Sequence, residues 1–236
     1  MKITSRVLLS FSIMIITGGF LTSATGQERS CKCGIGCGCT KDSLSVTCKC
    51  GMDHSMMMSH ENVFLKMMDT MMMAMDAVPL DASPEGNFLR QMIPHHEGAI
   101  EMAKYEIANG KDPQMLQLAK SILAEQQGEI VEMQALLRLY PLTANKQPSA
   151  EYKTAMSATM DTMMATTPTD SLLASKSIDC TFALVMLPHH QAAVDMAAAL
   201  LRFNPQGQVA NYALRIISDQ QIEIEQMATY ISKHCK

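Results

Sequence analysis

Tryptophan is absent from this sequence of 236 residues, and aromatic side chains make up 5% of it. The β-branched and aromatic residues that form sheets are missing from most segments, which indicates a helical fold. Net positive charge is also lacking, because the 23 acidic residues outnumber the 19 basic ones. Such a chain lacks the basic patch that binds nucleic acid. No Ser-His-Asp or Cys-His set typical of nucleophilic catalysis stands out. Methionine, with 23 residues, is the unusual abundance that needs an explanation.

The N-terminus has the pattern of a secretory signal peptide. Lys2 and Arg6 precede an apolar run over 7–21, and small residues follow around Ala24. An apolar run of 15 residues is shorter than the roughly 20 that cross a bilayer, so an uncleaved anchor is the weaker alternative, and no later segment is apolar enough to span a membrane. Residues 1–26 are therefore predicted to be a signal peptide. The protein is expected to be exported, either periplasmic or secreted, with no membrane span after cleavage.

Residues 27–60 form a low-complexity head with too little apolar bulk to fold unaided, so we expect this head to be disordered until something binds it. Its cysteines form three Cys-x-Cys pairs, and histidines follow them: Cys31, Cys33, Cys37, Cys39, Cys48, Cys50, His54 and His60. Clustered thiolates suit Cu(I) or Zn(II), whereas an even number of cysteines in an exported chain also suits a disulfide knot. Cys180 and Cys235 could pair with each other, which would tie the two halves of the remaining chain.

The rest of the chain is an internal duplication. Residues 88–103 repeat at 182–197 with 8 of 16 positions identical, and residues 119–133 repeat at 213–227 with 7 of 15 identical. Both alignments have the same offset of 94 and need no gap, which chance does not produce twice. The sequence therefore predicts a first helical repeat over 61–140, a linker over 141–149 and a second helical repeat over 150–236.

Helix start and stop signals divide each repeat into three helices. In the first repeat we expect them at about 61–77, 84–108 and 113–139. Ser83 and Asp112 are followed by proline at the first helical position, and Gly110 is a stop signal. In the second repeat, Asn204 and Pro205 are expected to open the last helix. The predicted fold is all-α, an antiparallel helical bundle of the ferritin-like or four-helix-bundle type, built from two repeated helical units.

Two adjacent histidines stand at equivalent positions of the two repeats, His95 with His96 and His189 with His190. At 100° per residue the first pair falls on the apolar stripe of its helix, together with methionine. A following helix presents glutamine, glutamate and methionine on one face, and these residues are Gln126, Glu129 and Met133, with Gln220, Glu223 and Met227 in the repeat. The histidines are either core groups bonded to that facing helix or metal ligands, and the repetition of the whole pattern favours metal.

The ligand types indicate copper. A di-iron carboxylate bundle needs Glu-x-x-His, whereas the repeated pattern here is Met-x-x-His-His. Thioether sulfur is a soft ligand that selects Cu(I), and imidazole suits copper in either oxidation state. Methionines over 67–75 are a further source of thioether or, alternatively, flexible core filler. Copper is therefore the expected ion, with Cu(I) favoured and Cu(II) possible.

At the level of family, "FLRQMIPHHEGAIEMA" with "AKSILAEQQGEIVEM", and their second copies, resemble a family of unknown function numbered 305, placed in the ferritin-like superfamily. Its CopM-type members are implicated in periplasmic copper binding and resistance. The resemblance implies a metal-binding set in each copy, namely Met92, His95, His96, Met102, Glu129 and Met133, and Met186, His189, His190, Met196, Glu223 and Met227. Whether the two glutamates bind metal or orient histidine stays open.

Three functions are compatible with these patterns. The favoured one is an exported copper-binding protein that sequesters the ion or delivers it to a transfer partner, for copper tolerance or homeostasis, and is not an enzyme. A ferritin-like metal-dependent oxidase would need an open coordination position and a substrate pocket. A helical interaction module would use the histidines only as structural groups.

Overall fold

The computed structural model describes residues 38–42, 45–49 and 60–236. The chain divides into one unit that ends at Met52 and another from Asp53 to Lys236. The first unit contains an antiparallel pair of strands, β1 (Gly38–Asp42) and β2 (Ser45–Lys49), in which Cys39 lies opposite Cys48. This hairpin is regular structure within the head that the sequence predicts to be disordered. The predicted signal peptide and most of the remaining head lie outside the described residues.

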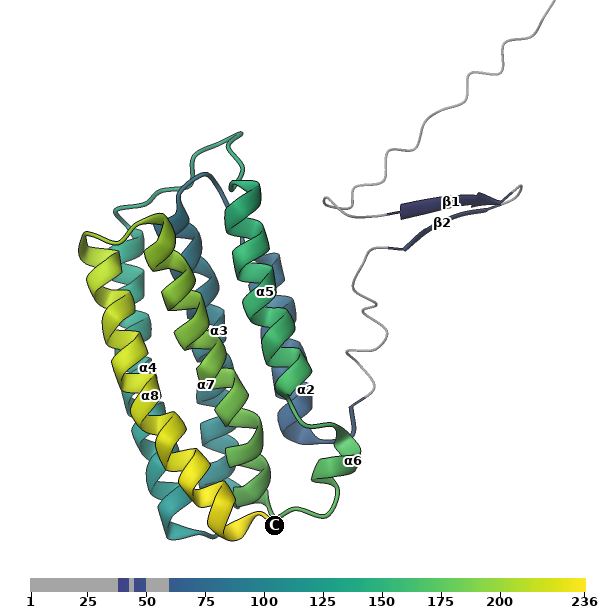
Figure 1. Ribbon diagram of the computed structural model, residues 1–236, viewed down its shortest axis with the longest axis vertical. Helices are drawn as coiled ribbons and strands as arrows, with labels where there is room; N and C mark the ends of the chain where they lie inside the picture. Colours follow the sequence, from purple (N-terminus) through teal and green to yellow (C-terminus); the bar gives the residue numbers. More distant parts are fainter. Residues whose placement is uncertain (1–37, 43–44, 50–59) are drawn as a thin grey trace, which may run out of the picture. The chain divides into compact units, whose positions relative to one another are not determined.

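The second unit is helical. Its elements are α2 (Val63–Ala77), α3 (Pro84–Asn109), α4 (Pro113–Leu137), α5 (Ala150–Thr166), α6 (Asp170–Leu173), α7 (Ile178–Phe203) and α8 (Gln208–His234). Three long helices precede the connection between the repeats and three follow it, and short loops make successive long helices antiparallel (Figure 1). The all-α bundle expected from the sequence is confirmed. The single turn α6 is an addition that the helical pattern did not reveal.

Capping side chains explain where several helices begin. The Ser83 hydroxyl accepts a hydrogen bond from the backbone N–H of Gly86, and the Asp112 carboxylate accepts from two N–H groups in the first turn of α4. Each satisfies donors that an α-helix leaves unpaired, and a proline follows each cap where no donor is needed. Gly110 ends α3 as predicted.

The start of α8 differs from the prediction. The helix begins at Gln208, after Gly207 with a φ of 101°, a left-handed conformation that favours glycine. Asn204 instead ends α7, and its side-chain amide donates to the Glu85 carboxylate at the start of α3. The prediction that Asn204 and Pro205 open this helix is therefore wrong: the Asn204 side-chain oxygen accepts from the N–H of Gln206, and the helix begins only after the turn at Gly207.

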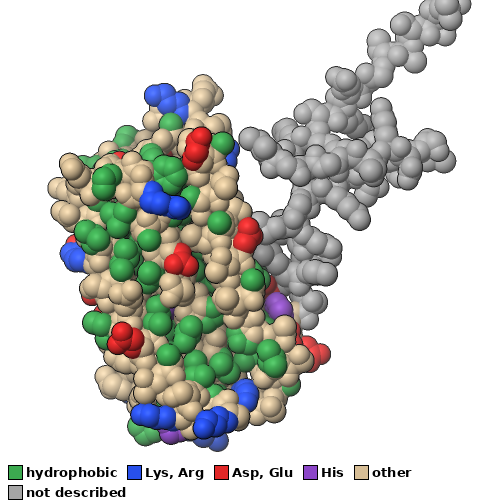
Figure 2. Space-filling view, in the orientation of Figure 1, with side chains coloured by type: hydrophobic (Ala, Val, Ile, Leu, Met, Phe, Trp, Pro, Cys, Tyr) green, Lys and Arg blue, Asp and Glu red, His purple; other side chains and the backbone are tan. Residues whose placement is uncertain are grey.

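The histidine-bearing helices occupy the middle of the bundle (Figure 1). α3 and α7 pack on each other, α4 and α8 flank them on one side, and α2 and α5 flank them on the other. Buried side chains from all six long helices form one hydrophobic core. On the face shown in Figure 2, charged side chains are scattered singly among apolar and neutral ones. In the described part of the chain, no helix is both long enough and apolar enough to cross a bilayer.

A disulfide joins Cys180, near the start of α7, to Cys235, just after α8. The sequence predicts this pairing as one option, but its expected role of tying the two halves together is wrong, since both helices belong to the second repeat. The bond closes a loop with a sequence separation of 55. A loop of this length restricts the unfolded chain by about 4 kcal/mol in the chain-entropy description. Such bonds persist in oxidising compartments.

Candidate metal centre

Four imidazoles form a layer at the centre of the bundle, where α3 and α7 pack together. His95, His96, His189 and His190 are all 0% exposed. The rings of His95 and His189, one from each repeat, lie with centroids 3.9 Å apart and planes tilted by 35°. The duplication therefore brings the two histidine pairs into one cluster, which we call the imidazole layer.

The outer histidine of each pair is bonded to a glutamate of the following helix. His96 Nε2 lies 2.9 Å from Glu129 Oε2, and His190 Nε2 lies 2.8 Å from Glu223 Oε2. A carboxylate accepts, so Nε2 carries the proton in each of these bonds. Nδ1 has no hydrogen-bond partner in either ring. The glutamates thus orient the histidines in the way that carboxylates orient metal-binding imidazoles.

The inner histidines have different surroundings. His189 Nε2 lies 3.1 Å from the sulfur of Met71, which comes from α2 of the other repeat. Neither ring nitrogen of His95 has a hydrogen-bond partner of ordinary geometry. Gly98 explains how Met71 comes so close, because a Cβ at this position would lie 2.8 Å from Met71 Cγ and 2.9 Å from its sulfur. The Met71 thioether of the first repeat therefore contacts the His189 imidazole of the second repeat, in the space that Gly98 leaves open.

Burial holds the inner histidines neutral. Loss of water is the main cause that lowers the pKa of His95 and of His189 well below its ordinary value, and the neighbouring imidazoles lower it further. Both rings are therefore uncharged at pH 7, and each keeps one nitrogen lone pair that protons do not occupy. Neutral imidazole is the form that binds metal.

The predicted methionine ligands lie in the hydrophobic core. They are Met92, Met102, Met133, Met186, Met196 and Met227, each at most 1% exposed. Gln126 and Gln220 are buried as well, and the carboxamide oxygen of each has no hydrogen-bond partner. Their positions on the inner helix faces agree with the expected stripes, whereas their role as ligands stays a prediction.

Met71 is a site residue that the sequence reasoning missed. It belongs to the methionine-rich segment 67–75, whose abundance suggested core filler as readily as ligands. The segment "MDTMM" occurs once in each repeat, which marks it as part of the repeated unit. The sequence does not reveal that Met71 reaches the histidine of the opposite repeat, because this contact depends on how α2 packs.

Carboxylates do not assemble a metal site around these histidines. Within residues 38–42, 45–49 and 60–236, no three His, Cys, Asp or Glu side chains are placed to hold an ion together. A carboxylate-rich centre of the di-iron type is thus not found in the described part of the chain. The donors that the layer offers are imidazole nitrogen and thioether sulfur, which fit copper.

The predicted ligands of the head are mostly outside the described residues. Cys31, Cys33, Cys37, Cys50 and His54 lie outside them, and only the backbone placement of Cys39 and Cys48 is described. His60 is described, and its Nδ1 lies 2.6 Å from the carboxylate of Asp170. Asp170 also accepts from the backbone N–H groups of Glu61 and Asn62, so His60 takes part in anchoring the start of α2.

Comparison with known proteins agrees with the repeated motif. An all-α bundle with a duplicated Met-x-x-His-His helix is the class defined by the observations above. The sequence matches the family described as Domain of unknown function (DUF305) over residues 19–137 and again over 85–231. Because these matches cover most of the chain, the protein belongs to this family, which confirms the resemblance seen in the sequence.

Several solved structures are similar to this chain. CopM in the Cu(I)-bound form is 26% identical and covers 63% of this chain and 95% of its own, with a TM-score of 0.47. A DUF305 fragment from Deinococcus radiodurans is 24% identical and covers 66% of this chain and 99% of its own, also with a TM-score of 0.47.

A curated relative is also similar. Uncharacterized protein L153 of Acanthamoeba polyphaga mimivirus is 48% identical over 50 residues, which is 21% of this chain. The match spans 33% of that relative, so the chain corresponds to about a third of its length.

Proposed function

We propose that this protein binds copper in the imidazole layer, with Cu(I) favoured and Cu(II) accepted. One observation carries the proposal: five imidazole nitrogens of the layer are buried without a hydrogen-bond partner, beside a thioether. Leaving a buried polar group unpaired costs about 1–3 kcal/mol. A bound metal ion would use the nitrogen lone pairs and so offset part of this cost.

The donor types favour copper over other ions. Hard cations such as Mg²⁺ and Ca²⁺ need oxygen ligands, and zinc is held by Cys, His, Asp or Glu and not by the sulfur of methionine. Here the sulfur of Met71 is a soft donor, and the imidazole of His189 beside it is a borderline donor. This combination suits Cu(I). Thioether is not protonated at ordinary pH, so part of the Cu(I) affinity would persist in acid.

The biological role we propose is sequestration or delivery of copper outside the cytoplasm, in support of copper tolerance or homeostasis. The disulfide between Cys180 and Cys235 supports an oxidising compartment, and the N-terminal pattern supports export. The Cys-x-Cys pairs of the head would provide a second copper site and a route of exchange with a transfer protein. Exchange between soft ligands needs no chemical change in the protein.

The test is copper analysis of the full chain in which the six head cysteines are replaced by serine. This chain is loaded anaerobically with Cu(I) and freed of excess metal, and the expected result is one or two copper ions per chain. A second protein carries His95→Leu and His189→Leu in addition. Leucine removes unpaired polar groups without a large change in volume, so we expect this bundle to stay folded and to lose copper.

Two outcomes would contradict the proposal. Copper retained by a folded His95→Leu and His189→Leu protein would make the histidines structural groups of an interaction module. Copper lost from the serine protein itself would place all binding in the head. Circular dichroism and the melting temperature, measured without metal, show whether each protein is folded.

We propose binding and not catalysis for this layer. An oxidase would show oxygen consumption that depends on added metal and disappears in the His95→Leu protein. Oxygen-electrode traces of the loaded chain test this alternative, and a flat trace is the expected result.

A further inference from the structure

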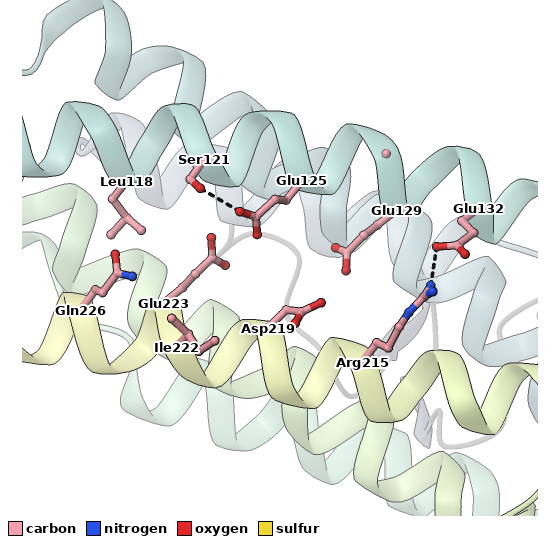
Figure 3. Close-up of a pocket in the computed structure, with 11 residues that line it drawn as sticks. Leu118, Ser121, Glu125, Glu129, Glu132, Arg215, Asp219, Ile222, Glu223 and Gln226 are labelled. Atoms are coloured by element: carbon pink, nitrogen blue, oxygen red, sulfur yellow. Dashed lines mark hydrogen bonds and ion pairs between the residues drawn. The ribbon is translucent and has the colours of Figure 1, made fainter.

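A groove of about 680 Å³ runs between α4 and α8, on the side of these helices shown in Figure 3. The duplication builds it, because all its lining residues except Leu118 come in pairs separated by 94 positions. These pairs are Ser121 with Arg215, Glu125 with Asp219, Gly128 with Ile222, Glu129 with Glu223, and Glu132 with Gln226. Gly128 leaves open space, since a Cβ there would meet no atom within 4 Å.

The groove is strongly acidic. Its lining includes five carboxylates, whereas Arg215 is the one basic residue among those that line it. Arg215 forms an ion pair with Glu132 at one end of the groove, so the other four carboxylates have no Lys or Arg partner among the residues that line it. Partial loss of water and the nearby Glu223, Glu129 and Asp219 raise the pKa of Glu125, which shows that these acids affect one another across the groove.

Two of these carboxylates also reach the imidazole layer. Glu129 and Glu223 line the groove, and each bonds through one oxygen to His96 or His190. Glu223 is 5% exposed, and its Oε1 is buried without a hydrogen-bond partner. Figure 3 shows Glu223 and Glu129 directed from opposite helices into the space between them. The groove and the layer therefore share these two side chains as a common wall.

We propose that this groove is the entrance through which a hydrated cation reaches the imidazole layer, with Glu125 and Asp219 attracting the ion first. The next carboxylates on the path are Glu129 and Glu223, whose displacement from the imidazoles would open the layer. This inference rests on the proposed copper binding.

The experiment compares rates of copper association in full chains with the six head cysteines replaced by serine, which prevents thiols from reducing Cu(II). Stopped-flow quenching of tyrosine fluorescence by Cu(II) reports the rate. The groove variant carries Glu125→Gln and Asp219→Asn. A matched control carries Glu151→Gln and Asp161→Asn, the same two changes at exposed positions of α5. Neither variant alters a residue bonded to a histidine.

Relative to the protein with only the serine replacements, we expect the groove variant to bind copper about three- to tenfold more slowly and the control to bind at an unchanged rate. An acidic cleft concentrates a cation more than scattered acidic residues do. Salt should slow copper association in the protein with only the serine replacements more than in the groove variant. The amount of copper bound at equilibrium should be the same in both. Equal association rates in all three proteins, or an equal decrease in both variants, would contradict the proposed role of the groove as an entrance. Absence of equilibrium binding of both Cu(I) and Cu(II) by the protein that carries only the serine replacements would instead overturn the proposed function itself.

Discussion

The outer histidine has the same kind of hydrogen-bond partner in both repeats, whereas the partner of the inner histidine differs between them. The bonds from His96 and His190 to glutamate differ by 0.1 Å, at 2.9 and 2.8 Å. Of the inner pair, His189 meets a thioether, whereas His95 has no hydrogen-bond partner. Duplication therefore preserved the part of the site that lies within one repeat and not the part that depends on a contact between repeats.

A single side chain explains much of this difference. Gly98 on α3 admits Met71, and the equivalent position on α7 is Ala192, which carries a methyl group. Met163 on α5 corresponds to Met71 in the shared "MDTMM" segment and is buried, but it makes no hydrogen bond to His95. The repeats thus differ in whether the methionine of the "MDTMM" segment contacts a histidine of the opposite repeat.

The repeats differ again near the end of α3. Glu106 is buried there with no hydrogen-bond donor among the described residues, whereas its equivalent on α7 is Leu200. Burial first, and then the adjacent Asp179, raise the pKa of Glu106 to about 8. Asp179 keeps its charge because the backbone N–H groups of Lys111 and Asp112 donate to it at 2.7 Å. The first repeat therefore contains a buried acid that the second lacks.

Replacing Glu106 by glutamine should have the largest effect, which is to remove most of the pH dependence of the free energy of unfolding near neutral pH. The folded pKa of about 8 exceeds the ordinary 4.5, so the protonated side chain contributes stability below pH 4.5 that is lost as the pH rises through 8. Between pH 6.5 and 8.5 this loss is on the order of 2 kcal/mol. Urea unfolding at these two pH values should show it in the wild type and not in the Glu106→Gln protein.

A control for this effect is Glu101→Gln, at an exposed position of the same helix. It should keep the pH dependence of the wild type. An unchanged slope in the Glu106→Gln protein would mean that Glu106 is ionised in the folded state at pH 7.

Gly98→Ala would make the first repeat resemble the second. The new methyl group would crowd Met71, and such overpacking typically costs about 1–3 kcal/mol, of which the better helix propensity of alanine recovers up to about 1 kcal/mol. We also expect weaker Cu(I) binding, because the sulfur of Met71 must move away from His189. Thermal unfolding and copper competition measure the two effects. The reciprocal Ala192→Gly should cost about 1–2 kcal/mol, through lower helix propensity and the loss of a buried methyl group, and leave the affinity unchanged.

Met71→Leu should separate the thioether from its packing. Leucine has a similar volume, so the free energy of unfolding should change by less than about 1.5 kcal/mol. We expect Cu(I) affinity to fall about tenfold, which is about 1.4 kcal/mol, in competition with a Cu(I) chelator. Met163→Leu, the equivalent change in the second repeat, should leave the affinity unaltered. Equal losses in both proteins would show that the two inner histidines bind copper alike.

Gly128→Ala should have the smallest effect. Its equivalent, Ile222, is 57% exposed, and a methyl group at position 128 would meet nothing within 4 Å. Alanine is favoured over glycine within a helix, so the protein should become more stable by about 0.5–1 kcal/mol, measured by urea unfolding. A loss of stability would indicate that something else occupies the groove at this position.

Local signals in the sequence predicted much of the fold. Ser83 and Asp112 start helices because a short polar side chain can satisfy the free N–H groups that follow it, and this depends on neighbours in the chain. Asn204 carries the same signal and accepts from the N–H of Gln206, but it does not start a helix, because the chain turns at Gly207 before α8 begins. The head remains a prediction, with only the hairpin described.

The sequence by itself determined the helices, their duplication and the burial of both histidine pairs, since the periodicity of 3.6 residues places them on the apolar stripe whatever packs against it. Tertiary structure decided which atoms meet those histidines. Met71 reaches the opposite repeat because Gly98 lets α2 approach closely, and the acidic groove exists because α4 and α8 lie side by side. Such contacts join residues far apart in the chain, and their distances depend on the packing of whole helices, which no local pattern encodes.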